Sequence, residues 1–162
     1  MHVVADGPEQ TRSTGRSSPQ RGLIPTDATA GGKHTSLSGG LRILIVEDET
    51  VLAMQLEDVV QELGHVVVGS VASRTQALAN VEMSRPDLAL MDINLGPGGD
   101  GIEVAVELRR RFDVPSVFVS AYLSLPNMKE RAQAAQPLGF VPKPYTQWEI
   151  EAALKQAADQ LR

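Results

Sequence analysis

Carboxylate side chains follow two separate apolar runs in this sequence, at the point where each run ends. Glu47, Asp48 and Glu49 come directly after Leu-Arg-Ile-Leu-Ile-Val, and Asp92 comes directly after Leu-Ala-Leu-Met. Carboxylates that gather at one point repel one another unless a cation joins them. Ligand sets made only of oxygen atoms favour magnesium over zinc. If the fold brings these residues together, the sequence therefore predicts a magnesium site.

A hydroxyl and an amine follow two further apolar runs. Ser120 ends one of these runs, and Lys143 lies just beyond the other. An aspartate is ionised at neutral pH, since its reference pKa is about 3.9, and it can act as a nucleophile that forms an acyl phosphate. Phosphoryl transfer requires in-line positioning and neutralisation of charge on the transferred oxygens. A magnesium ion, Ser120 and Lys143 would supply that neutralisation, so the pattern predicts a phospho-aspartate site.

Asp92 is the better candidate for the phosphorylated carboxylate. It is central in chain order, and a glycine-rich loop over residues 96–99 follows it. The chemistry of the carboxylates alone leaves the choice among them open.

The elements that must position these residues alternate along residues 41–162. Apolar runs predict strands over 41–46, 65–69, 88–92, 115–120 and 140–141, and apolar residues at helical spacing predict helices over 52–63, 73–84, 102–112, 124–136 and 147–161. This alternation is typical of a doubly wound α/β fold with a five-stranded parallel sheet. By analogy with that class we expect the strand order 2-1-3-4-5. Ligands of such sheets bind at the carboxyl ends of the strands, where the polar residues lie.

Helix starts are marked by local sequence signals. Three pairs have the spacing of capping boxes, namely Ser73 with Gln76, Asp100 with Glu103, and Thr146 with Glu149. Pro126 falls in the first turn of the fourth predicted helix, where its missing N–H costs little.

Residues 1–40 differ in composition from the rest of the chain. Half of them are Gly, Pro, Ser or Thr, and all six aromatic residues lie after residue 40. Such a composition is typical of segments that bury too little apolar surface to fold. We therefore expect a disordered N-terminal extension over 1–40 and one folded domain over 41–162.

Composition also excludes several classes of protein. The chain has no cysteine and three scattered histidines, which excludes disulfide scaffolds and thiolate or histidine-rich metal sites. No apolar run approaches the roughly 18 residues of a membrane span, and the first thirty residues lack a secretory apolar core. The net charge of -5 argues against a nucleic-acid partner. We expect a cytoplasmic protein that binds neither nucleic acid nor membrane.

Four motifs resemble those of the receiver domain of two-component response regulators. They are Val46-Glu-Asp-Glu49, Leu90-Met-Asp-Ile-Asn94, Val119-Ser-Ala-Tyr122 and Gly139-Phe-Val-Pro-Lys-Pro144. The resemblance covers residues 41–162 and implies a flavodoxin-like (βα)5 fold. It also implies that the chain accepts a phosphoryl group from a sensor histidine kinase or a histidine phosphotransfer protein.

The resemblance implies a role for each matching residue in binding magnesium and phosphate. Asp92 matches the phosphoacceptor and a Mg²⁺ ligand. Asp48 matches the carboxylate that binds Mg²⁺ directly, and Glu47 matches its neighbour, which usually acts through water. Asn94 matches the residue whose backbone carbonyl binds the metal.

Further roles around the site follow from the same resemblance. Ser120 matches the switch hydroxyl, Lys143 matches the phosphate-pairing lysine, and Phe140 matches the aromatic switch residue, here without a tyrosine hydroxyl. The peptide bond after Lys143 is expected to be cis, as it commonly is in receivers. The residues expected to flank the site are Ala121, Tyr122 and Pro144.

Because no output domain follows the last predicted helix, the sequence predicts a single-domain response regulator. The resemblance to receivers, which often pair, makes a homodimer one of the expected partners. We expect no enzymatic activity beyond self-phosphorylation and autodephosphorylation.

The main alternative is a receiver-fold scaffold that works without phosphorylation. An aspartyl-phosphate phosphatase of the haloacid dehalogenase type is disfavoured because Asn94 stands where that class needs an acid. A flavodoxin-like cofactor binder is disfavoured because Glu47, Asp48 and Glu49 would repel a phosphate.

Overall fold

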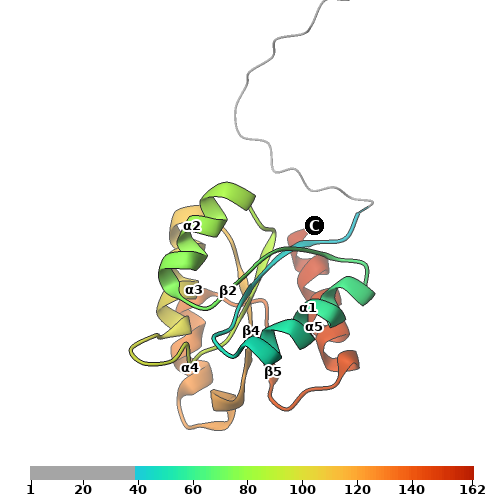
Figure 1. The fold of residues 1–162 in the computed structure, drawn as a ribbon. Helices are drawn as coiled ribbons and strands as arrows, with labels where there is room; N and C mark the ends of the chain where they lie inside the picture. The colour runs from blue at the N-terminus through green and yellow to red at the C-terminus, as the bar shows by residue number, and fades with distance from the viewer. Residues whose placement is uncertain (1–38) are drawn as a thin grey trace, which may run out of the picture. The chain divides into compact units, whose positions relative to one another are not determined.

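A five-stranded parallel sheet forms the centre of the computed structural model, which describes residues 39–162 (Figure 1). The predicted extension over 1–40 lies outside the described residues, apart from its last two. The strands are β1 (Arg42–Val46), β2 (Val66–Val71), β3 (Leu88–Met91), β4 (Ser116–Ser120) and β5 (Gly139–Pro142). Their order is β2-β1-β3-β4-β5, and every pair is parallel, so the predicted fold class and strand order are confirmed.

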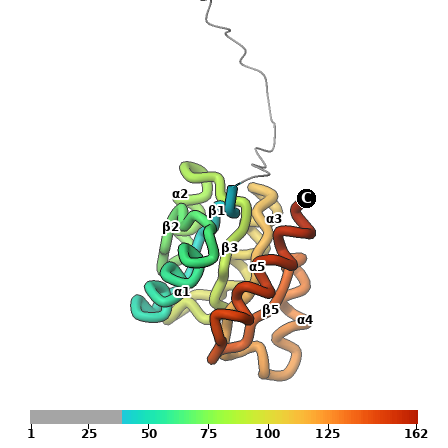
Figure 2. The backbone as a smooth tube through the Cα atoms, turned by 90° about the vertical axis from the view of Figure 1, so that its right-hand side faces the viewer, coloured from blue at the N-terminus to red at the C-terminus, as the bar shows by residue number. Residues whose placement is uncertain are grey.

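Helices cover both faces of this sheet (Figure 2). They are α1 (Thr50–Glu62), α2 (Arg74–Ser84), α3 (Gly101–Phe112), α4 (Met128–Ala132) and α5 (Gln147–Leu161), with two short 3-10 turns, η1 (Ala121–Ser124) and η2 (Gln133–Ala135). Buried side chains of α1 and α5 pack on one face, and those of α2, α3 and α4 pack on the other. Among the described residues, no helix has the length and apolar character needed to cross a membrane.

The central strands are apolar apart from the exposed Arg42 at the start of β1 and the serines at the two ends of β4, because both faces of these strands are buried. Along β1, Leu44 and Val46 face the core under α2 and α3, whereas Ile43 and Ile45 face the core under α1 and α5. Residues of β3 and β4 are buried at every position. Full burial of such a side chain stabilises the fold by about 1.5–3 kcal/mol. The apolar runs therefore hold the strand ends, and the polar residues that follow them, at fixed positions.

The predicted capping boxes differ in detail. Thr146 and Glu149 form a complete box, in which each side chain accepts a hydrogen bond from the other residue's backbone N–H. Ser73 accepts from the N–H of Gln76, but the Gln76 side chain accepts from Ala72 and not from Ser73.

The fourth helix is shorter than predicted, and Pro126 lies before it rather than in its first turn. The residue before a proline avoids the helical region, and Leu125 is extended, with ψ 146°. Asn127 then adopts a left-handed conformation, with φ 61°. The expected continuous helix over 124–136 is therefore wrong, and η1, α4 and η2 take its place.

Candidate functional site

Three carboxylates meet at the carboxyl ends of β1 and β3. Glu47, Asp48 and Asp92 each offer an oxygen atom, and these atoms lie within 4.8 Å of one another. Parallel pairing produces this convergence, because the Asp92 N–H donates to the carbonyl of Val46 at 2.9 Å. Glu47 and Asp92 are buried, whereas Asp48 is exposed.

Lys143 joins this cluster from the loop after β5. Its Nζ lies 2.6 Å from Glu47 Oε2 and 3.0 Å from Asp92 Oδ2. The lysine side chain is 12% exposed, and those of Glu47 and Asp92 are 1% and 7% exposed. The Lys143 N–H donates to the carbonyl of Ser120, which fixes the loop to the end of β4. The bond between Lys143 and Pro144 is cis, as expected.

Burial and ion pairing shift the pKa values of Glu47 and Lys143. Burial raises the pKa of Glu47 above its usual value, although the hydrogen bond from Lys143 acts in the opposite direction. Burial alone would lower the pKa of Lys143, but its hydrogen bonds to Glu47 and Asp92 outweigh that effect and raise it. The cluster therefore keeps its lysine charged.

The carboxylates differ in how they are held by the protein. Glu47 uses both oxygens, because Oε2 pairs with Lys143 and Oε1 accepts from the Glu49 N–H at 3.1 Å. Asp92 pairs with Lys143 through Oδ2, and its Oδ1 accepts weakly from the Asn94 N–H at 3.4 Å. Within residues 39–162, no hydrogen bond or ion pair holds the Asp48 carboxylate. Three oxygen donors with one exposed member fit a hard cation that retains water, such as Mg²⁺.

A close backbone approach fixes the loop between β3 and α3. A Cβ atom at Gly101 would overlap the carbonyl oxygen of Asp92, and the Gly101 N–H donates to Ile93 at 2.7 Å. Asp100 begins the helix by accepting from the Ile102 N–H at 2.8 Å. The requirement for glycine at position 101 is not among the sequence-based predictions, although a glycine directly after the N-cap Asp100 is a usable signal for it.

Ser120 and Tyr122 lie at the end of β4. The Ser120 side chain is fully buried, and its Oγ accepts from the Tyr122 N–H at 3.3 Å. Among the described residues, no hydrogen bond joins Ser120 Oγ to Asp92 or Lys143. The Tyr122 ring lies next to the loop after β3, since its hydroxyl accepts from Asn94 Nδ2 at 3.4 Å.

The side chain of Phe140, a residue of β5, packs against its neighbour strand β4 and against α4. Its ring stacks on Phe118 with centroids 6.0 Å apart, and the Lys129 amine lies 5.9 Å from the Phe140 centroid. The side chain is half-buried. Phe140 is thus in contact with the α4 surface but makes no polar link to the carboxylate cluster.

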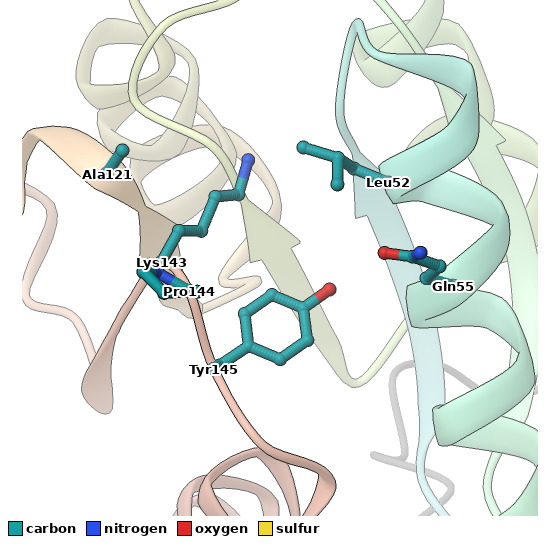
Figure 3. A pocket seen from close by; sticks show the side chains of 6 residues that line it. All are labelled: Leu52, Gln55, Ala121, Lys143, Pro144 and Tyr145. Carbon is teal, nitrogen blue, oxygen red and sulfur yellow. The ribbon is translucent and has the colours of Figure 1, made fainter.

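A pocket of about 310 Å³ opens beside the lysine, between α1 and the loop after β5 (Figure 3). The Tyr145 ring and the Lys143 chain border it on one side. The Tyr145 hydroxyl is buried without a hydrogen-bond partner in the described part of the chain, and burial raises its pKa. The lining residues are Leu52, Gln55, Ala121, Lys143, Pro144 and Tyr145.

Similar proteins share this domain. The phyllosphere-induced regulator PhyR of Methylorubrum extorquens is 35% identical over 127 residues, which are 78% of this chain and 46% of that protein. The transcriptional regulatory protein PdtaR of Mycobacterium tuberculosis is 31% identical over 121 residues, covering 75% of this chain and 58% of that protein. The chain thus matches about half the length of these curated relatives.

Structural and family comparisons agree with these matches. The solution structure of the receiver domain of Erythrobacter litoralis PhyR is 38% identical, with a TM-score of 0.66, and the match covers 74% of this chain and 90% of that one. The model of the response regulator receiver domain matches residues 43–155. Together with the parallel sheet and the acidic cluster at its carboxyl edge, these matches show that the chain belongs to the receiver domain family of response regulators.

Proposed function

We propose that this chain accepts a phosphoryl group on Asp92 from a sensor histidine kinase or a histidine phosphotransfer protein, in a Mg²⁺-dependent reaction in the cytoplasm. The observation that carries the proposal is the convergence of Glu47, Asp48 and Asp92 with the buried Lys143. The similarity to proteins named as regulators supports a signalling role.

The metal would be held by the carboxylates of Asp48 and Asp92 and the backbone carbonyl of Asn94. Glu47 would act through water, because both of its oxygens already accept hydrogen bonds from the protein. When bound, Mg²⁺ neutralises charge on the transferred phosphoryl oxygens.

The residues of the chain supply the rest of the chemistry. An oxygen of Asp92 attacks phosphorus, the phosphorus–nitrogen bond to the donor imidazole breaks, and that nitrogen keeps the electron pair. Lys143, already 3.0 Å from Asp92 Oδ2, offers its positive charge to the phosphoryl oxygens. Ser120 would donate a hydrogen bond to the phosphoryl group through its hydroxyl. Its side chain would turn toward Asp92 and away from the Tyr122 N–H, from which it now accepts a hydrogen bond.

The output would be a changed protein-interaction surface. When Ser120 moves, Phe140 would adjust its packing, because its ring stacks on Phe118, which lies two residues before Ser120 on the same face of β4. This switch rests on packing alone, since Phe140 has no hydroxyl.

Incubation with acetyl phosphate tests the proposal against the scaffold alternative. We expect the intact mass to rise by one phosphoryl group in the presence of Mg²⁺ and to stay unchanged in excess chelator. An unmodified mass under both conditions would favour a scaffold that works without phosphorylation. Sustained release of phosphate from a phosphomonoester would instead favour the phosphatase alternative.

Tyr122 is expected to prolong the lifetime of the phosphorylated state. Its hydroxyl contacts the Asn94 side chain on the loop that follows Asp92, and from this position the ring would limit the access of water to Asp92. We expect Tyr122→Ala to lose its phosphoryl group severalfold faster than wild type, and Tyr122→Phe, which keeps the ring, to lose it at nearly the wild-type rate. The decay of phosphoprotein after removal of the donor measures both rates. Equal rates for wild type and Tyr122→Ala would rule out a shielding role.

A further inference from the structure

Two glycines of the loop between β3 and α3 share one backbone conformation but differ in their surroundings. Gly96 has φ +77° and Gly98 has φ +80°. Residues other than glycine rarely adopt this left-handed backbone conformation. A Cβ atom at Gly96 would lie 2.9 Å from Asp48 Oδ2, whereas a Cβ atom at Gly98 would have no neighbour within 4 Å. Of these two positions, only 96 therefore lies against a carboxylate of the acidic cluster.

The neighbour of Gly96 is the carboxylate with the fewest restraints. Glu47 and Asp92 are buried and paired with Lys143. The Asp48 side chain is exposed, and no hydrogen bond or ion pair fixes it within the part of the chain that the structure describes. Its position relative to the other two carboxylates therefore depends on the space that glycine leaves open at position 96.

We infer that Gly96 is a positioning residue for the metal site, because its missing side chain leaves the space that the Asp48 carboxylate needs to share a cation with Asp92. The inference rests on the proposed function, in which Asp48 is a metal ligand. A methyl group at position 96 displaces the carboxylate rather than the loop, since the end of an exposed side chain moves more easily than backbone. Changes in residues that orient metal ligands typically weaken metal binding by about 10–100-fold.

Calorimetric titration of the full chain with MgCl₂ tests this inference, with Gly98→Ala as the matched control for Gly96→Ala. Both substitutions place a side chain at the same left-handed backbone, so we expect similar decreases in Tm. We expect Gly96→Ala alone to raise the Kd for Mg²⁺ by about tenfold. Equal Kd values for the two variants would overturn the positioning role. Failure of the wild-type chain to bind Mg²⁺ would overturn the proposed metal site itself, and the two results are distinguishable.

A double-mutant cycle separates an effect through Asp48 from a general disturbance of the loop. In an Asp48→Ala background, Gly96→Ala should cause no additional loss of Mg²⁺ affinity, because the displaced group is absent. An undiminished tenfold loss in that background would contradict the inference. If the alanine variants do not fold, Gly96→Asn and Gly98→Asn replace them, since asparagine tolerates the left-handed region better.

Discussion

Replacing Lys143 with methionine is expected to lower the free energy of unfolding by about 3 kcal/mol and to abolish efficient phosphoryl uptake. Methionine keeps an unbranched chain but removes the charge that lies 2.6 Å from Glu47 and 3.0 Å from Asp92. Both carboxylates are buried, so the substitution would leave their negative charges without a cationic partner in a place where burial disfavours charge. Loss of one partner of a buried ion pair is costly for this reason.

Urea unfolding at neutral pH without Mg²⁺ measures this effect, with the exposed Lys155→Met as the control. The control should change the free energy of unfolding by less than about 0.5 kcal/mol. If Lys143→Met were as stable as Lys155→Met, the buried ion pairs would not contribute as the structure indicates.

The pH dependence of the Lys143→Met variant follows from Glu47. The folded-state pKa of Glu47 lies above its unfolded value of 4.5 because of burial. The stability that comes with protonated Glu47 is therefore fully present below pH 4.5 and is lost as the pH rises through the folded-state pKa. Without the lysine the folded-state pKa of Glu47 rises further. The difference in free energy of unfolding between wild type and Lys143→Met should therefore shrink as the pH falls from 7 towards 4.5. A gap that stays constant over this window would argue against an unpaired Glu47 as the cause.

Asp92→Asn is expected to prevent phosphoryl uptake and, without Mg²⁺, to make the folded protein more stable. Glu47, Asp48 and Asp92 contribute three negative charges and Lys143 one positive charge, so the cluster carries a net charge of -2. Removing one negative charge relieves repulsion while Lys143 keeps its pair with Glu47. We expect a gain of about 1 kcal/mol, or a rise in Tm of about 4 °C, because the repulsion from Glu47 and Asp48 outweighs the attraction of Lys143.

Thermal unfolding with and without Mg²⁺ measures this change, and Asp58→Asn on the exposed face of α1 is the matched control. Wild type and Asp58→Asn should both gain stability when Mg²⁺ is added, whereas Asp92→Asn should gain much less. An Asp92→Asn protein that is destabilised without Mg²⁺, or that gains as much from Mg²⁺ as wild type, would contradict a repulsive cluster that shares a cation.

The sheet and the place of the cluster could be predicted because local sequence determines both. Runs such as Ile43–Val46 are apolar at consecutive positions, as strands buried on both faces must be. Parallel pairing then brings the residues after β1 and β3 together whatever their side chains are. The convergence of Asp48 with Asp92 therefore follows from the pairing of β1 with β3, which analogy with the fold class predicted.

Other features depend on contacts that a sequence pattern does not encode. The extended Leu125 and left-handed Asn127 replace the first turn of a helix that apolar spacing alone predicts. The direct pairing of Glu47 with Lys143 depends on the conformations of two side chains that are 96 positions apart in the sequence. The close approach of Gly101 to Asp92 and of Gly96 to Asp48 depends on the path of a loop without periodicity.

Locating the phosphoryl group within the chain tests the central claim most directly. Wild-type protein is treated with acetyl phosphate and Mg²⁺, the acyl phosphate is trapped by borohydride reduction, and the modified residue is identified by peptide mass spectrometry. Modification of Asp92, and its loss in excess chelator, is the predicted result. Modification of Asp48, Glu47 or Asp100 in its place, or no modification at any carboxylate, would contradict the assignment of Asp92 as the Mg²⁺-dependent phosphoacceptor.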